Sequence, residues 1–589
     1  MAARRSSRPV AVVFVAVAAL FLFLTLSGRH NGYSAPGCAS AAAGGDPASL
    51  LGTPASARSH DYFLLPDDLK RGVAFRGTGA RARAVAARLL AGKPVHVAVA
   101  GGSVAWGQGA PGGAHFGRRF FDWVNTTWPA PASAPHRFTN AAKPGITSAL
   151  FALCGDDLIP QDADIVVLEF AFNDFYAGLN ITGAERAAYE RLVRRVLRFP
   201  SAPAVFSMHF FSYWYAKAKL KAPGQALFYN TGEDDLAVIA QFYDVPVLSL
   251  RNAAIHHMYR NDSGFRVDLM TPKKVPGTNL SDYFYWDDHH PYEHTGHRAM
   301  ADLLVAAMHE AVQEAHQAGA GAADTYAAAA AAVQQGKQQQ KQRQQQTRPE
   351  LPALPPPMFP GNYESQQAVC RLGAAFKGVV VESSGFEYKA QRPEGPTFVA
   401  QKWAWVGAAP GAYAVLQLDT RLRRHRGIDA AADGERLGAE QSEKESGGSS
   451  GNSSSGNSSS GKSSSGKSSS DSGGIGGAQD GGQGGNLARV YLGHTRSWQQ
   501  LGTARVECVA GCKCKPATLD NHWRSKNTQN AMFALEVTQH AACSIRVTVD
   551  PPASREVTPT TALTAVMVDS AGAADIDRKG NIGQWDMWH

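Results

Sequence analysis

Residues 95–109, VHVAVAGGSVAWGQG, decide the fold of the first half of the chain. The first six residues form an apolar, β-branched run, which is typical of a buried strand, and Gly101 and Gly102 end it. Ser103 follows directly. Because glycine tolerates positive φ and close backbone approach, Ser103 can be presented at the carboxyl edge of a sheet, where α/β folds bind their ligands. A strand followed by Gly-Gly-Ser is also a common turn, so this stretch alone leaves both interpretations open.

Short apolar runs alternate with helical stretches between residues 61 and 312. Strands are predicted at residues 95–100, 165–170, 204–210 and 247–250. Amphipathic spacing predicts helices at residues 184–198 and 298–312. The first helix carries four arginines, which we predict to form a solvated face: Arg191, Arg194, Arg195 and Arg198. Strands that alternate with helices indicate a parallel sheet covered on both sides.

Two more segments place polar groups next to these apolar runs. Asn173 and Asp174 follow the predicted strand at 165–170. An amide at this edge can donate a hydrogen bond to an oxyanion, and one such donor is worth about 3 kcal/mol in the transition state. Gly145 lies in the loop TNAAKPGITS, residues 139–148, where its backbone N–H is a second candidate donor and a helix is predicted to begin near the end. Taken singly, both segments are also ordinary turn chemistry.

The segment YWDDHHPYEHTGH, residues 285–297, is the most informative one. A serine hydroxyl is a poor nucleophile unless an imidazole takes its proton, and the imidazole needs a carboxylate that fixes its tautomer and stabilises its cation. His290 supplies the imidazole and Asp287, three residues earlier on the same loop, supplies the carboxylate. The spacing therefore favours nucleophilic chemistry at Ser103.

The alternative for this histidine-rich segment is a metal site formed by His290, His294 and His297. Pro291 disfavours the helix that an i, i+4 pair of ligands would require, so we predict neither a metal nor another cofactor. The remaining histidines of interest are given no chemical role: His256, His257, His289 and His297.

The chain contains these four segments in the order Gly101-Gly102-Ser103, Gly145, Ala171-Phe172-Asn173-Asp174 and Asp287-Asp288-His289-His290-Pro291. In order and spacing it resembles the SGNH hydrolase superfamily over about residues 95–312. The resemblance implies a flavodoxin-like three-layer α/β/α fold, with Ser103 as nucleophile, His290 as general base and Asp287 as the acid that orients it. It also implies an oxyanion hole from the Ser103 backbone, Gly145 and the Asn173 side chain. The family often has aspartate before the serine and glycine at the start of the third block, where this chain has Gly102 and Ala171.

The N-terminus predicts entry into the secretory route. Three arginines precede an apolar run of about 17 residues at positions 10–26, near the lower limit for a membrane span. Residues 1–30 are therefore predicted to be a signal anchor with a cytoplasmic tail, giving a single-pass type II protein of the Golgi or secretory lumen or cell surface. Ala-Ser-Ala at 39–41 leaves cleavage and secretion open. Six glycosylation sequons agree with this route: Asn125, Asn180, Asn261, Asn279, Asn452 and Asn457.

Composition divides the rest of the chain. Residues 313–360, with the tract QQGKQQQKQRQQQ and a proline-rich end, are predicted to be a linker between a catalytic domain at 61–312 and a second domain at 361–570. A Ser/Gly-rich insert at 427–485 is predicted to be a disordered loop. Six short β-rich runs predict that the second domain is a β-sandwich. They lie at 378–381, 414–418, 488–492, 532–537, 544–549 and 563–568.

Side chains of the second domain permit more than one role. Trp403, Trp405 and the aromatics of 491–498 are predicted mainly to pack in the core, with stacking on sugar rings as the alternative. Four of the seven cysteines fall there and are predicted to form disulfides in an oxidising compartment: Cys508, Cys512, Cys514 and Cys543. Their spacing does not match a zinc finger or ribbon.

Charge excludes one class of partner. The formal net charge is +8, but much of the basic excess lies in the leader and the predicted linker, and the sequence has no basic-aromatic nucleic-acid motif. We therefore predict no nucleic-acid partner, membrane attachment through the N-terminal helix, and a small-molecule or polysaccharide ester as substrate. The predicted function is a serine esterase acting on O-acetyl groups of carbohydrate. A polysaccharide O-acetyltransferase with the same site and an inactive, membrane-anchored carbohydrate-binding protein are the alternatives.

Overall fold

A computed structural model describes the chain over residues 60–174, 184–218, 224–332, 354–364, 369–391, 393–394, 401, 403–422, 487–498, 501–522 and 528–570. These residues all belong to one compact unit, Thr53–His589. The predicted signal anchor at 1–30 and the insert at 427–485 lie outside the described residues, so they stay predictions. Within the described ranges, no helix combines the length and apolar character that crossing a membrane requires.

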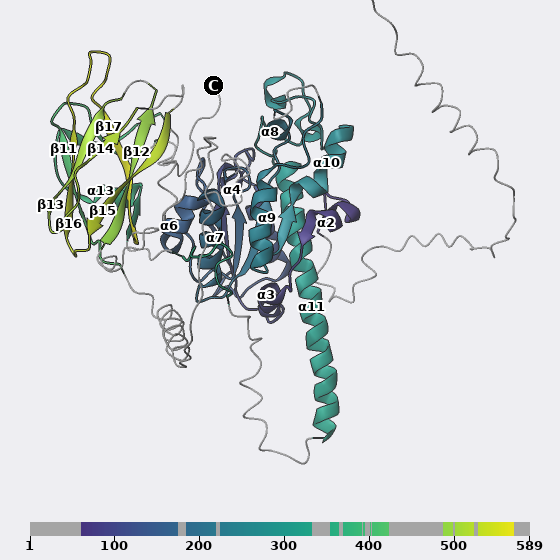
Figure 1. The fold of residues 1–589 in the computed structure, drawn as a ribbon. Coiled ribbons are helices and arrows are strands. Elements are labelled where there is room, and N and C mark those ends of the chain that lie inside the picture. Colours follow the sequence, from purple (N-terminus) through teal and green to yellow (C-terminus); the bar gives the residue numbers. More distant parts are fainter. Residues whose placement is uncertain are drawn as a thin grey trace, which may run out of the picture. The chain divides into compact units, whose positions relative to one another are not determined.

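A six-stranded, mostly parallel sheet organises residues 60–312 (Figure 1). Its order is β1-β6-β5-β4-β2-β3, and β1 alone runs antiparallel to its neighbour. Counted from β2, the parallel strands have the order 2-1-3-4-5, which is the order of flavodoxin-like sheets. The strands are β1 Val73–Phe75, β2 His96–Gly101, β3 Arg137–Asn140, β4 Ile165–Glu169, β5 Ala204–His209 and β6 Val247–Ser249. All four predicted strands are confirmed, whereas β1, which is only three residues long, and β3, which is largely polar, were not predicted.

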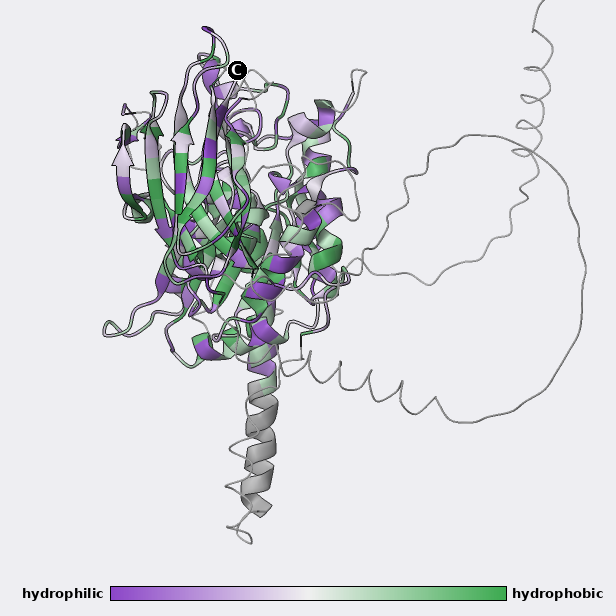
Figure 2. Ribbon diagram, turned by 60° about the vertical axis from the view of Figure 1, so that its left-hand side comes forward, coloured by the Kyte–Doolittle hydropathy of each residue, from purple (hydrophilic) through white to green (hydrophobic). Residues whose placement is uncertain are grey.

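Helices cover both faces of this sheet because successive strand residues point in opposite directions. Val97 and Val99 of β2 pack with α3, α5, α10 and α11, whereas Ala98 and Ala100 pack with α6, α7 and α9. Figure 2 shows hydrophobic residues gathered along the strands and the helix faces that cover them. The helices are α2 Pro66–Gly72, α3 Ala80–Leu90, α4 Ser103–Trp106, α5 Phe116–Thr127, α6 Ser148–Leu158, α7 Ala184–Leu197, α8 Tyr213–Ala218, α9 Gly232–Phe242, α10 Leu250–Arg260 and α11 Gly296–Ala332. Two 3₁₀ turns lie at η3 Pro272–Lys274 and η4 Leu280–Asp282.

The predicted solvated face of α7 is wrong. Arg191, Arg194 and Arg195 are all buried, and only Arg198 lies at the surface. Arg194 donates to the carbonyl of Pro355 at 2.7 Å and pairs with Glu364 at 3.2 Å. Residues 354–364 supply polar partners to Arg191 and Arg194, and α6 supplies those of Arg195, the carbonyl of Ala152 and the carboxylate of Asp156, so these arginines can be buried. Amphipathic spacing cannot reveal such a distant partner.

Helix α11 is longer than predicted. It begins at Gly296 and ends at Ala332, so the predicted end at Val312 is wrong. Its extension is the alanine-rich run that composition placed in the linker. Because alanine has the highest helix propensity of all residues, this run continues the helix.

Two antiparallel sheets make up the described part of residues 369–570. One has the order β15-β12-β17-β10-β9, with β7 paired to β17, and the other has the order β14-β13-β16-β11-β8. They share one buried core, to which Leu492 and Val566 contribute from the first sheet and Leu416 and Val547 from the second. This is the arrangement of a β-sandwich. The elements are β7 Val369–Leu372, α13 Ala374–Lys377, β8 Val380–Ser384, β9 Phe386–Ala390, β10 Trp403–Gly407, β11 Tyr413–Leu418, β12 Leu487–Ser497, β13 Thr503–Ala510, β14 Ala517–Asp520, β15 Thr528–Thr538, β16 Cys543–Val549 and β17 Thr561–Ser570.

The six predicted β-rich runs all overlap strands of these two sheets. Strands β7, β9, β10, β13 and β14 were not predicted. Tyr491 is fully buried, in agreement with core packing. Trp403 and Trp405 are half-buried; the ring of Trp403 stacks on Tyr388, and that of Trp405 contacts Tyr388 at a tilt.

Three disulfides are formed by six of the seven cysteines. They are Cys154–Cys370, Cys508–Cys514 and Cys512–Cys543. Oxidation of the four C-terminal cysteines is therefore confirmed. Cys154–Cys370 was not predicted and joins α6 to β7, across a sequence separation of 216 residues. Such a pairing depends on the tertiary fold and cannot be deduced from spacing.

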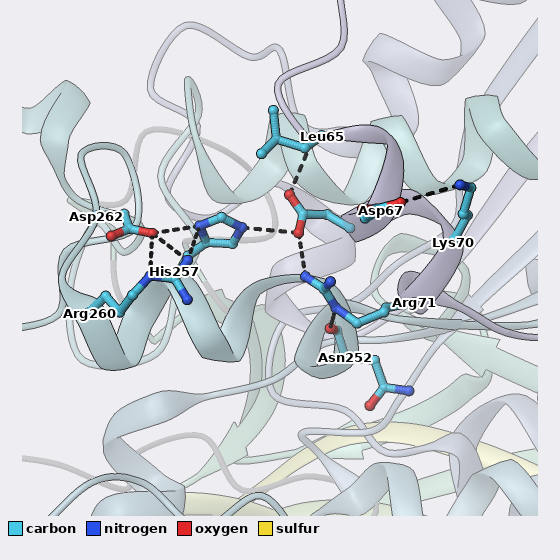
Figure 3. A network of polar contacts seen from close by, with 9 residues as sticks. Leu65, Asp67, Lys70, Arg71, Asn252, His257, Arg260 and Asp262 are labelled. Carbon is cyan, nitrogen blue, oxygen red and sulfur yellow. Dashed lines mark hydrogen bonds and ion pairs between the residues drawn. The ribbon is translucent and has the colours of Figure 1, made fainter. Parts of the chain in front are cut away.

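A polar network ties α2 to α10 through His257 (Figure 3). One ring nitrogen lies 3.0 Å from Asp68 and the other 2.7 Å from Asp262. Asp68 is almost fully buried and also accepts the N–H of Leu65 at 3.0 Å and a hydrogen bond from Arg71. His257, which had no role in the sequence analysis, therefore has a structural one.

Replacing this histidine should destabilise the fold. His257→Gln keeps the size of the side chain but cannot reach both carboxylates, so we expect the free energy of unfolding to fall by about 1–2 kcal/mol. The measurement is urea unfolding followed by circular dichroism. His256→Gln, at the exposed neighbouring position, is the control and should stay within about 0.5 kcal/mol of wild type. Equal stability of both variants would contradict the structural role.

Candidate active site

Ser103 lies where the sheet ends. It is the first residue of the short helix α4, directly after β2 and Gly102, and is 8% exposed. The glycines before it leave room for close neighbours. A Cβ on Gly101 would lie 2.4 Å from the carbonyl oxygen of Glu169, so glycine at 101 lets β2 and β4 meet closely. A Cβ on Gly102 would lie 2.4 Å from the side-chain nitrogen of Asn173, so glycine at this position, where the family often has aspartate, leaves room for that amide.

Asp287 and His290 lie on one loop and face Ser103. The Nε2 atom of His290 is 3.1 Å from the Ser103 hydroxyl oxygen, and its Nδ1 atom is 2.9 Å from Asp287 Oδ1. Asp287 also accepts the backbone N–H of His290 at 2.9 Å, which fixes the turn between them. The three predicted residues therefore form one continuous series of hydrogen bonds, although Ser103 and His290 are 187 residues apart in the sequence.

The serine loop and the histidine loop touch each other at Gly109. This residue has φ +91°, and a Cβ there would lie 2.0 Å from the carbonyl oxygen of Pro291 and 3.2 Å from the Cβ of His290. Glycine is needed at this position both for its positive φ and for the close contact. Side chains farther along hold the same two loops together, since Glu293 accepts the N–H groups of Gly112 and Ala114.

Electrostatics keep Asp287 ionised and His290 uncharged. Burial of Asp287 opposes its ionisation, but the hydrogen bonds and charge of His290 outweigh it and hold the pKa of the carboxyl well below its usual range. Burial also lowers the pKa of His290, against the opposing effect of Asp287. An uncharged imidazole beside a carboxylate carries its proton on Nδ1, which leaves Nε2 able to accept the proton of Ser103.

The two predicted oxyanion donors reach the same edge of the sheet. The Asn173 amide lies against Gly102 and donates one hydrogen bond to the carbonyl of Ile146 at 2.7 Å. An amide carries two N–H groups, so this bond orients the second. Gly145 has φ +72° and lies in the loop after β3. This loop is attached to the end of β2, because the backbone N–H of Lys143 donates to the carbonyl oxygen of Gly101 at 3.0 Å. The loop ends at α6, whose first residue is Ser148, as predicted.

Other histidines near the site have supporting contacts. The ring of His289 stacks on that of Phe172, with 5.1 Å between the ring centroids, and its centroid lies 3.8 Å from that of the His290 ring. His297 is fully buried, and its Nε2 lies 3.0 Å from the carbonyl of Gln108. His297 therefore supports the loop after α4, a contact that its position at a helix start did not reveal.

The potential metal-ligating groups in the described residues differ from the set considered in the sequence. They are Asp287 with His289 and His290, and Cys508 with Cys512 and Cys543. The structure thus does not group His290 with His294 and His297. Both ring nitrogens of His290 already face Asp287 and Ser103, and the three cysteines are in disulfides.

One buried acid at this edge was not predicted. Glu169, the last residue of β4, is 2% exposed and lies beside the turn that carries Ser103. In the sequence, Glu169 is the one acidic residue in the otherwise apolar run IVVLEF, and this isolated charge was the only sign of a buried acid.

Comparison with known proteins gives structural likeness only. Neither a protein-family profile nor a curated protein sequence matches the chain. A two-domain esterase active on acetylated mannans, co-crystallised with mannopentaose, is 16% identical with a TM-score of 0.49, covering 85% of this chain and 98% of that one. A possible lipase from Chitinophaga pinensis is 16% identical with a TM-score of 0.26, covering 37% of this chain and 98% of that one. A lipase/acylhydrolase from Enterococcus faecalis is 17% identical with a TM-score of 0.22, covering 36% and 93%. Similarity at this level assigns neither a substrate nor residue roles.

Proposed function

We propose that the chain is a serine esterase of the SGNH type. The observation that carries the proposal is the continuous hydrogen-bonded chain from Asp287 through His290 to the hydroxyl of Ser103. It lies at the carboxyl edge of a parallel sheet, where α/β proteins bind ligands. A nucleophile, a base and a group that orients the base are the elements that acyl transfer requires.

The chemistry proceeds in two steps. His290 Nε2 takes the proton of Ser103 as its oxygen attacks the ester carbonyl, and the same proton then passes to the departing alcohol as the acyl–oxygen bond breaks. Asp287 stabilises the imidazolium that forms in between. In the second step His290 removes a proton from water as the water attacks the acyl-serine. That proton then passes to the Ser103 oxygen as its bond to the acyl group breaks, and the acid is released. The oxyanion of each tetrahedral intermediate is placed near Asn173, Gly145 and the Ser103 backbone.

O-acetyl groups of carbohydrate are the proposed substrates. Three disulfides support an oxidising compartment, where extracellular and luminal polysaccharides are found. Sequons at Asn125, Asn261 and Asn279 lie at exposed positions that a glycosylating enzyme could reach, whereas Asn180 lies outside the described residues. The secretory location, with a type II anchor or a cleaved leader, is part of this proposal.

The test of substrate class uses purified full-length protein. Release of acetate from acetylated mannan and xylan is compared with hydrolysis of p-nitrophenyl acetate and of a long-chain p-nitrophenyl ester. We expect turnover of the acetyl esters and little of the long-chain one. Preference for the long chain would instead indicate a lipid substrate and overturn the carbohydrate assignment.

An acceptor sugar in the same assay separates the alternatives. Acetylated acceptor in place of free acetate would show an O-acetyltransferase, because a sugar hydroxyl would then replace water in the second step. Binding of the polysaccharide without turnover of any ester would show the carbohydrate-binding protein considered from the sequence.

A further inference from the structure

Glu169 contacts the turn that carries Ser103 in two ways. Its carboxyl group accepts the backbone N–H of Ala105, two residues after Ser103 in α4. Its own carbonyl oxygen lies 3.3 Å from the N–H of Gly102, the residue before Ser103. The backbone and the side chain of Glu169 therefore hold both sides of the nucleophile.

The surroundings of this carboxyl group lack a compensating cation. Among the described residues no cation interacts with Glu169, and its Oε1 atom has no hydrogen-bond partner. The titratable groups that interact with it are Asp174, which follows β4, and Tyr189 of α7. Asp174 is also buried and accepts the N–H of Ser148 at 2.9 Å. From α4, the backbone N–H of Ala105 approaches the carboxyl group.

Burial in such surroundings favours the neutral acid. Desolvation, opposed by the Ala105 hydrogen bond and assisted by the charge of Asp174, raises the pKa of Glu169 to about 8. Asp287, by contrast with Glu169, is held ionised by hydrogen bonds from the backbone N–H and the ring Nδ1–H of His290. The site therefore has two acids whose surroundings give them different charges.

We propose that Glu169 is a positioning residue that holds the Ser103 turn and must be uncharged for the proposed esterase to act. This inference rests on the proposed function. As Ser103 attacks, negative charge develops on the acyl oxygen next to this turn, and a second negative charge in a region of low dielectric would raise the energy of that transition state. A neutral carboxyl can keep the turn in place without this penalty.

The pH profile of kcat/KM tests the inference. Wild type is expected to lose activity above about pH 8, to about a tenth of its plateau at pH 9, as Glu169 ionises. Glu169→Ala should lie about 100-fold below the wild-type plateau at every pH, because the Ala105 N–H loses its partner. Glu169→Gln should restore most of that loss, since an amide oxygen can accept the same bond, and should keep its activity at pH 9.

Thermal unfolding gives a readout without activity. The pKa of Glu169 is raised in the fold, so its contribution to stability is fully present below about pH 4.5 and is lost as the pH rises through about 8. Glu169→Gln cannot lose a proton, so its melting temperature should rise relative to wild type between pH 5 and pH 8. Glu387→Gln, whose side chain is 75% exposed, is the control and should follow wild type throughout.

Two results would overturn the inference. One is a Glu169→Gln pH profile that superimposes on that of wild type; the other is parallel melting temperatures of the two proteins from pH 5 to pH 8. Failure of the proposed function is distinct, because then wild type and Ser103→Ala turn over no ester at any pH, while the melting experiment still reports the charge of Glu169.

Discussion

Ser103→Ala is expected to lower kcat for p-nitrophenyl acetate by at least about 10⁴-fold. The proposed mechanism forms an acyl-serine, and alanine has no oxygen to acylate. His290 would then lose the hydroxyl that lies 3.1 Å from its Nε2 atom. The fold should be kept, because alanine is slightly smaller than serine. The measurements are steady-state kinetics and covalent labelling by a fluorophosphonate probe, which should mark wild type and not the variant.

Ser201→Ala is the matched control for this substitution. Its hydroxyl donates to the carbonyl of Ala163 at 2.7 Å, in the connection that leads into β5, at the opposite edge of the sheet from Ser103. We expect activity within about threefold of wild type and unchanged labelling. Equal turnover by wild type and Ser103→Ala would reject Ser103 as the nucleophile, and with it the proposed mechanism.

Asp287→Asn should lower kcat/KM by about 10⁴-fold. The amide has nearly the shape of the carboxylate, but it carries no charge to stabilise the imidazolium. Its N–H₂ group would also favour the tautomer of His290 with the proton on Nε2, where it blocks transfer from Ser103. The loss should appear in kcat, with KM changed little, because Asp287 acts on the transition state rather than on the bound ester.

Asp288→Asn separates this effect from a general loss of negative charge. Asp288 is the next residue, and its carboxylate lies 2.7 Å from Nδ1 of His289 rather than contacting His290. We expect less than a tenfold change in kcat/KM. If the two asparagine variants lost activity equally, the orientation of His290 by Asp287 would not explain the effect.

Much of the parallel sheet could be predicted because its strands are buried on both faces. The apolar runs at 95–100 and 165–170 need no partner to be recognised, since parallel strands carry a continuous apolar signal. β3, with the sequence RFTN, lies at the sheet edge and is mostly half-exposed, so it has no such signal. The five site residues were predicted by type and order, and the structure adds the distances that link Ser103, His290 and Asp287.

Most of what the sequence did not reveal depends on contacts between distant segments. The arginines of α7 have the spacing of a solvated face, and only their partners on α6 and in residues 354–364 show why they are buried. The pairing of Cys154 with Cys370 and the contacts of His257 with Asp68 and Asp262 have the same origin. A local pattern describes one element, whereas burial depends on everything that packs against it.

The sequence by itself determined which residues could perform acyl transfer and that they would follow strands of one parallel sheet, because apolar periodicity and side-chain chemistry are local properties. Only the tertiary structure decided that Ser103, His290 and Asp287 form one hydrogen-bonded chain and that Glu169 lies buried beside them. Both depend on how closely β2, β4 and the loop at 285–291 approach, and glycine at 101 and 109 permits that approach, because a Cβ there would collide with the carbonyl oxygen of Glu169 or of Pro291.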